Sequence, residues 1–197
     1  TIYHEHIFYF SLTAVAKIFQ ANGLRIFDVE EHEIHGGSIR VFAQHCDTGE
    51  HEKQPAVEQM LEVEKYLGVS SSDYYRSFQA SAEKAKDALL AFLLKAKLER
   101  KRVGAYGAAA KGNTFLNFSG IRSDLISFVS DRNPNKQGKF MPGSHIPIVD
   151  EGQIMKQQPD YVVILPWNLR DEIIHQLEWI RKWDGRFVTG IPDLNIN

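Results

Sequence analysis

The sequence has 197 residues, of which 43% are apolar and 24% are charged, with a net charge of −2. These proportions are typical of a soluble globular protein and leave no face-sized excess of Lys and Arg, which argues against a nucleic-acid partner. The longest apolar runs, residues 88–94 and 161–166, are too short to span a bilayer, so we expect no membrane partner either.

The single cysteine and the first residues indicate the compartment and the extent of the chain. Cys46 alone excludes an internal disulfide and fits the reducing cytoplasm. Thr1 opens directly into a polar, aromatic segment, with no initiator methionine and no signal-like apolar stretch. We therefore interpret the chain as a fragment of a longer cytoplasmic protein.

The first region predicts a helix followed by two antiparallel strands. Apolar residues recur at helical spacing over residues 12–20, Ser11 is a candidate N-cap, and Asn22-Gly23 ends the helix. Residues 24–30 and 38–43 alternate with period two around a pair of glycines, which favours a hairpin. Because one helix cannot cover both faces of a strand pair, this region needs a neighbour.

A polar segment then leads into a helical region. Residues 46–55 carry three acidic residues and a proline, which indicates a linker, and residues 56–67 predict a short helix. Residues 70–73 offer N-cap candidates for one long helix that runs to about Arg100. The predicted division of the chain is residues 1–45, 46–72 and 73–197.

The last part alternates strands with helices. Strands are predicted at residues 102–107, 125–131, 146–149, 161–166 and 186–191, and helices at 108–117, 151–157 and 168–182. Such alternation predicts an α/β, Rossmann-like parallel sheet with helices on both faces. The nearly continuous apolar run at 161–166 is typical of a strand that is buried on both faces.

The turn after the first of these strands predicts a nucleotide or phosphate site. Small residues there let backbone N–H groups approach an anion at a helix N-terminus. The residues expected at this site are Gly107, Ala108, Lys111, Gly112, Asn113 and Thr114. The glycine spacing is not the G-x-G-x-x-G fingerprint, so simple packing of the turn stays an alternative.

Two further strand ends carry candidate binding residues. Asp131 closes the second strand, at the place where an acid usually meets a ribose hydroxyl. Trp167 follows a later strand, at the edge where open parallel sheets bind ligands. Its indole suits stacking on a base or a sugar, and it equally suits a rim position that covers a helix start.

The opening segment Tyr3-His4-Glu5-His6 is open to three interpretations. A metal site needs a third ligand, for which His32, His35 and His45 are candidates, but no ligand spacing is recognisable. Structural histidines beside an acid are the second interpretation. The third is acid–base work, because imidazole, carboxyl and phenol groups suit removal of a proton next to a carbonyl.

At this point the sequence resembles the sugar C-methyltransferases of deoxysugar biosynthesis, over nearly the whole chain. The motifs that carry the resemblance are the segments at residues 2–11, 35–41, 107–114, 131–138, 141–143 and 164–168. The resemblance implies three parts: a zinc-binding N-terminal domain, a central domain that binds S-adenosylmethionine, and a Rossmann-like C-terminal domain. In this view residues 1–45 close the methyltransferase fold, and both the zinc cysteines and the donor motif lie upstream.

The resemblance also implies a substrate and a mechanism. The substrate resembles a thymidine-diphosphate 4-keto deoxysugar, whose ketone acidifies the neighbouring carbon. His6 would be the base, with Glu5 and Tyr3 orienting it or stabilising the enolate. The nucleotide-sugar would be positioned by the turn at residues 107–114 together with Asp131, Lys136, Trp167 and Asn168.

Two other classes of function compete with this hypothesis. One is a nucleotide- or CoA-binding module without catalysis, in which the opening segment is structural. The other is a nicotinamide-dependent oxidoreductase, suggested by Gly104 and Gly107. The imperfect glycine spacing argues against the oxidoreductase.

Overall fold

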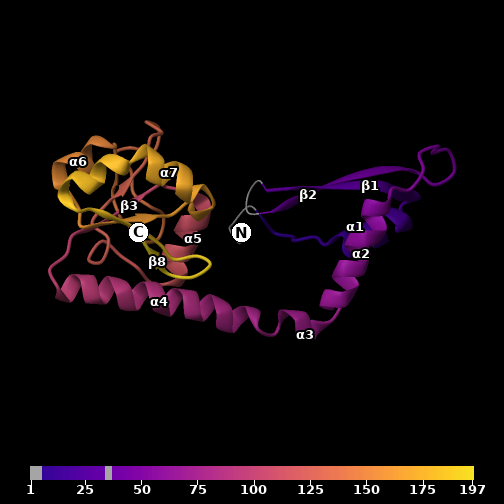
Figure 1. Ribbon diagram of the computed structural model, residues 1–197, viewed down its shortest axis with the longest axis horizontal. Coiled ribbons are helices and arrows are strands. Elements are labelled where there is room, and N and C mark those ends of the chain that lie inside the picture. Colours follow the sequence, from indigo (N-terminus) through magenta and orange to yellow (C-terminus); the bar gives the residue numbers. More distant parts are fainter. Residues whose placement is uncertain (1–5, 34–36) are drawn as a thin grey trace. The chain divides into compact units, whose positions relative to one another are not determined.

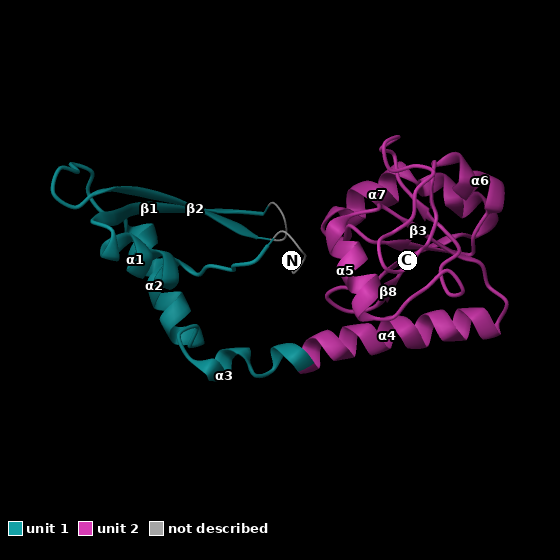
Figure 2. Cartoon of the chain, turned by 180° about the vertical axis from the view of Figure 1, so that it is seen from behind, with its two compact units in different colours: residues 1, 6–79 teal, residues 2–5, 80–197 magenta. Residues whose placement is uncertain are grey.

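The computed structural model of the chain describes residues 6–33 and 37–197. These fall into two compact units, residues 6–79 and residues 80–197 (Figure 2). Tyr3 and Glu5, two of the three predicted catalytic residues, lie outside the described residues. Over the described ranges, no helix has both the length and the apolar character that a bilayer span requires.

The first unit contains a long β-hairpin and two helices that pack on it (Figure 1). Its elements are α1 (Leu12–Ala21), β1 (Leu24–His32), β2 (Ser38–His45), α2 (Pro55–Leu67) and α3 (Ser72–Tyr75). β1 and β2 pair antiparallel, with Leu24 opposite His45 and His32 opposite Ser38. The helix and hairpin predicted from the spacing are therefore confirmed.

A small core and one carboxylate join α1 to α2 in this unit. The buried side chains of the core are those of Leu12, Ile26, Val29 and Val57. The Glu64 carboxylate of α2 accepts hydrogen bonds from the backbone N–H groups of Leu12 and Thr13, each at 2.7 Å. Because these N–H groups have no partner inside the helix, Glu64 caps α1 from a distant part of the sequence.

The prediction of one long helix up to Arg100 is wrong in one respect, because this segment forms two helices. α3 ends at Tyr75, and α4 (Phe78–Leu98) begins after a short break. The Ser71 side chain accepts the Asp73 N–H at 3.2 Å and so caps α3 as a separate turn. The apolar spacing continues through the break, which is why the pattern does not reveal it.

The second unit is built on a six-stranded sheet with the order β5-β4-β3-β6-β7-β8. The strands are β3 (Val103–Tyr106), β4 (Val129–Ser130), β5 (Ile148–Val149), β6 (Tyr161–Ile164), β7 (Arg186–Thr189) and β8 (Asn195–Ile196). All neighbours pair parallel except β7 with β8, which pair antiparallel. The predicted Rossmann-like sheet is confirmed, with β8 as an edge strand that the sequence pattern did not predict.

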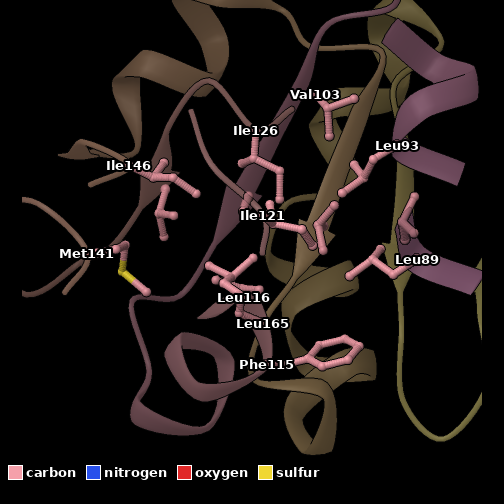
Figure 3. Close-up of a cluster of buried hydrophobic side chains, with 14 of the residues drawn as sticks. Leu89, Leu93, Val103, Phe115, Leu116, Ile121, Ile126, Met141, Ile146 and Leu165 are labelled. Atoms are coloured by element: carbon pink, nitrogen blue, oxygen red, sulfur yellow. The ribbon is translucent and has the colours of Figure 1, made fainter. Parts of the chain in front are cut away.

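Helices cover both faces of this sheet, as predicted. α4 and α5 (Ala110–Phe118) pack on one face, where Leu89, Leu93 and Leu116 are fully buried (Figure 3). α6 (Gly152–Gln157) and α7 (Arg170–Gln176) pack on the other face. Successive strand residues alternate between the two cores, because side chains of a strand point to opposite faces.

Several elements are shorter than predicted, among them the strand expected at 146–149, which is reduced to Ile148–Val149. The strand expected at 125–131 is reduced to Val129–Ser130, because the N–H groups of Leu125 and Ile126 bond back to the Arg122 carbonyl in a turn. Ile126 is nevertheless fully buried, so its apolar character reflects the core rather than a strand. The helix expected at 168–182 is α7 flanked by 3₁₀ turns at Trp167–Leu169 and Glu178–Trp183.

The strand order creates a switch point between β3 and β6. From β3 the chain proceeds to β4 and β5 on one side, whereas β6 leads to β7 on the other side. Ligands of open α/β sheets bind beyond the carboxyl ends of the strands at such a point. The residues that follow β3 and β6 are therefore the ones to consider as a site.

Candidate functional site

Two glycines allow the turn after β3 to approach β6 closely. Gly107 has a φ of 86°, and a Cβ there would lie 2.4 Å from the Pro166 Cγ. Gly112, inside α5, is buried, and a Cβ would lie 2.6 Å from the Leu165 Cβ. Both positions are therefore restricted to glycine by packing, whether or not a ligand binds.

Asp131 holds this turn in place. One oxygen of its carboxylate accepts the Ala108 N–H at 2.7 Å, and the other accepts the Asn133 N–H at 2.8 Å. Gln137 donates its side-chain amide to the Asp131 carbonyl at 2.9 Å. The carboxylate thus ties the β3–α5 turn to the loop that follows β4.

Lys136 joins the same two segments. Its ammonium donates to the Ala108 carbonyl at 2.8 Å and lies 3.5 Å from the Asp131 carboxylate. An ammonium has three N–H groups, and the Ala108 carbonyl and the Asp131 carboxylate accept two of them at most. One N–H group of Lys136 is therefore left for a further acceptor. The structure therefore brings together Ala108, Asp131 and Lys136, which are 28 residues apart at most in the sequence.

A hollow of about 600 Å³ opens on this side of α5, and we call it the β4–β5 hollow. Four of the predicted binding residues line it, namely Ala108, Asn113, Thr114 and Lys136. Lys139, Phe140 and Met141 line it as well, and among the residues that the structure describes no Asp or Glu does. The N-cap of α5, Ala109, provides no side-chain cap, so the first N–H groups of α5 add to the positive character of the hollow.

Lys111, Trp167 and Asn168 form a second group of predicted residues. The Lys111 ammonium donates to the Asn168 side-chain oxygen at 2.8 Å and lies 5.5 Å from the centre of the Trp167 ring. Burial lowers the pKa of the Lys111 ammonium below its ordinary value. Trp167 also packs edge-on against Phe115, with ring centres 6.3 Å apart.

A smaller hollow of about 290 Å³ lies beside this group. Its lining comes from residues 167–172, which include the cationic Arg170 and the acidic Asp171 and Glu172, and from Ile191 and Pro192 beyond β7. The sequence placed all the predicted binding residues at one site. The structure instead divides them: Ala108, Asn113, Thr114 and Lys136 line the β4–β5 hollow, and Trp167 and Asn168 line the smaller one. Gly107, Lys111, Gly112 and Asp131 line neither hollow.

His6, the predicted base, belongs to the first unit. It is exposed, and its ring lies edge-on to the Tyr9 ring at 6.0 Å. Tyr3 and Glu5 lie outside the described residues, and so does His35, one of the candidate metal ligands. Within the part of the chain that the structure describes, no group of three or more His, Cys, Asp or Glu is arranged to hold a metal ion.

Comparison with known proteins identifies the family. Residues 33–192 match the C-methyltransferase C-terminal domain. The chain belongs to this family. It is 38% identical to the C-methyltransferase NovU of Streptomyces niveus over 193 residues, which cover 98% of the chain and 46% of NovU. The chain spans slightly less than half the length of this relative. The C-methyltransferase resemblance predicted from the motifs is confirmed.

Sequence reasoning did not select Lys139 and Phe140 in this C-methyltransferase domain. Both residues line the β4–β5 hollow, and Phe140 is 61% exposed. They lie between the two motif segments at 131–138 and 141–143. A cationic residue beside an aromatic residue is the sequence pattern that could have indicated them as binding residues.

Proposed function

We propose that this chain is part of an enzyme that transfers a methyl group from S-adenosylmethionine to the carbon next to the ketone of a nucleotide-linked deoxysugar. Membership of the C-methyltransferase family carries the proposal. The relative NovU is itself named a C-methyltransferase. The substrate class goes beyond these names and rests on the resemblance of the motif segments to the sugar C-methyltransferases. We place the reaction in the cytoplasm, as the single cysteine suggests.

In this proposal the second unit holds the nucleotide-sugar, with thymidine diphosphate as the nucleotide part. A diphosphate is a double anion, and the first turn of α5 offers it uncapped N–H groups with Lys111 on one side and Lys136 on the other. Gly107 and Gly112 contribute by their lack of a side chain, and Asp131 by fixing the turn. Asn113, Thr114, Trp167 and Asn168 complete the proposed set.

The proposed chemical step uses the opening segment, in which residues 1–45 close a methyltransferase fold. Neutral His6 accepts the proton from the carbon beside the ketone, and the electrons of the C–H bond move onto the carbonyl oxygen as an enolate. Glu5 and Tyr3 orient the imidazole or stabilise the enolate oxygen. The enolate carbon is then the nucleophile that receives the methyl group.

S-adenosylmethionine supplies the methyl group when it is bound, and we assign it no residue of this chain. An adenosine at a glycine-rich turn needs an acid for its ribose hydroxyls. Asp131, the acid at this turn, already accepts two backbone N–H groups, and Gly107 lies against Pro166. We therefore propose that a part of the enzyme other than these 197 residues holds the donor. The resemblance to the sugar C-methyltransferases is the support for assigning zinc to a separate domain.

The proposed base is tested by proton exchange in the full-length enzyme. In deuterium oxide, with the keto-sugar present and the donor omitted, the wild type is expected to exchange the hydrogen next to the ketone. The change His6→Ala should reduce this exchange and the methyl transfer by at least about a hundredfold, because general bases contribute on that order. Substrate affinity, measured by calorimetry, should change little.

The matched control is His4→Ala, which removes a neighbouring imidazole from the same segment. It should leave exchange within a fewfold of the wild type. Exchange that survives His6→Ala but is lost in His4→Ala would transfer the role of base to His4. Exchange that survives both changes would remove this segment from the mechanism.

A further inference from the structure

Phe140 presents an aromatic ring to solvent at the rim of the β4–β5 hollow. The residue is 61% exposed, although its backbone is held in a bridge with Pro147. Hydrogen bonds on either side fix this backbone, from the Met141 N–H to the Ile146 carbonyl and from the Ile148 N–H to the Lys139 carbonyl, both at 2.8 Å. The backbone that carries the Phe140 ring is therefore held by hydrogen bonds on both sides. An aromatic face held in this way is a stacking surface for a flat partner.

The charge around this ring is positive. Lys136 and Lys139 line the hollow, and no Asp or Glu of the described ranges lines it. Lys136 already donates to the Ala108 carbonyl and lies near Asp131, so its position is determined by the protein. Lys139 is exposed, and among the described residues no acid lies within ion-pair distance of it. An unneutralised ammonium beside an aromatic face suits a ligand that is both flat and anionic.

The size of the hollow fits such a ligand. Its volume of about 600 Å³ lies within the range of roughly 300–1,000 Å³ that is usual for small-molecule sites. Apolar side chains, among them Met141, Pro142 and Ile148, form much of its wall. A base with its sugar can therefore lie against this wall while its phosphates reach the lysines.

We propose that the β4–β5 hollow is the nucleoside-diphosphate subsite, in which the Phe140 ring stacks on the base and Lys139 pairs with the diphosphate. This assignment rests on the proposed function, because it divides the nucleotide-sugar between the β4–β5 hollow and the smaller hollow beside Trp167. The sugar then lies toward Trp167. Neither Phe140 nor Lys139 belongs to the residues that the sequence motifs selected.

The test is a set of calorimetric titrations of the 197-residue chain with three probes: thymidine diphosphate, thymidine and inorganic pyrophosphate. Phe140→Ala should weaken the binding of thymidine diphosphate and of thymidine by about tenfold or more, because stacking contributes on that order. The affinity for pyrophosphate should stay unchanged. Lys139→Gln should weaken thymidine diphosphate and pyrophosphate, by about three- to tenfold at low salt and less at high salt, and leave thymidine unchanged.

A conservative variant separates stacking from a structural effect. Phe140→Trp keeps a flat ring, so it should restore the affinity for thymidine diphosphate, and the introduced indole should lose fluorescence when the ligand is added. Matched controls are Phe118→Ala and Lys156→Gln, which alter an exposed phenylalanine and an exposed lysine outside the hollow. Both controls should bind all three probes as the wild type does.

The outcomes distinguish this assignment from the proposed function. If the wild type binds thymidine diphosphate and neither Phe140→Ala nor Lys139→Gln weakens it, the subsite assignment is wrong and the proposed function stands. If the wild type binds none of the three probes, the proposed placement of the nucleotide-sugar in the second unit is overturned together with the subsite. Weaker thymidine binding in Phe140→Ala, together with weaker pyrophosphate binding in Lys139→Gln, supports the subsite.

Discussion

At the scale of single residues, the candidate site depends on groups that shape the backbone as much as on groups that face a ligand. Gly107 and Gly112 let the β3–α5 turn and α5 lie against β6. The Asp131 carboxylate accepts hydrogen bonds from two backbone N–H groups. Lys111, Lys136 and Lys139 are the residues that give the two sides of α5 their charge.

Gly112→Ala is expected to destabilise the second unit by about 1–2 kcal/mol. Alanine favours a helix over glycine by about 1 kcal/mol, but overpacking a core costs about 1–3 kcal/mol. The added methyl would lie 2.6 Å from the Leu165 Cβ, so the packing cost is at the upper end. Denaturant unfolding measures the difference, with Gly152→Ala at the start of α6 as control. A stabilised Gly112→Ala protein would contradict the close packing of α5 on β6.

At the scale of elements, the ends of strands are joined by side chains from distant positions. Asp160, just before β6, accepts the Arg102 N–H at 2.8 Å and the Lys101 ammonium at 3.0 Å. Its carbonyl accepts the Arg186 N–H at the start of β7. One residue thus fixes the starts of β3, β6 and β7, at the edge opposite the candidate site.

This connection makes stability depend on pH in the acidic range. Burial alone would raise the pKa of the Asp160 carboxyl, but the Arg102 N–H and the Lys101 ammonium outweigh it and hold the pKa below the ordinary value. A carboxyl with a lowered pKa in the folded state stabilises the fold above its unfolded pKa, and this contribution is lost as the pH falls through the folded pKa.

Asp160→Asn should therefore lower the stability at pH 7, and it should converge with the wild type as the pH falls through the lowered pKa of the folded Asp160 carboxyl. Denaturant unfolding between pH 7 and pH 2 measures this. Asp193→Asn removes only an exposed pair with Lys84, so it should have little effect at any pH. A stability gap for Asp160→Asn that stays constant down to pH 2 would contradict the proposed role of the charge.

At the scale of the whole molecule, the two units have separate cores. The first unit buries a small group of side chains around Leu12, whereas the second has a core on each face of its sheet. The boundary falls between Gln79 and Ala80, close to the start of α4. The buried residues of α4, from Ala85 to Ala96, all belong to the second unit.

We expect residues 80–197 to fold without the rest of the chain. Hydrogen exchange should protect β3, β6 and β7 in this shortened protein as well as in the 197-residue chain, because both cores of the sheet are retained. A collapsed state with unprotected strands would show that residues before Ala80 are needed for this fold.

The sequence by itself determined the class of the fold and the family. Period-two and helical spacings identified the hairpin, the alternating strands and the helices, because side-chain periodicity is a local consequence of backbone geometry. The motif segments predicted the C-methyltransferase family, which the match over residues 33–192 confirmed. Strand lengths were less certain, as at Ile126, because a buried turn residue is as apolar as a strand residue.

The tertiary structure alone decided which residues meet. It separated Lys111 from Lys136, because Lys111 bonds to Asn168 beside Trp167 whereas Lys136 bonds to the Ala108 carbonyl. It also brought Phe140 to the hollow at the α5 N-terminus through a bridge with Pro147. Contacts between segments that are distant in the sequence depend on strand order and side-chain packing, and no local pattern encodes either of them.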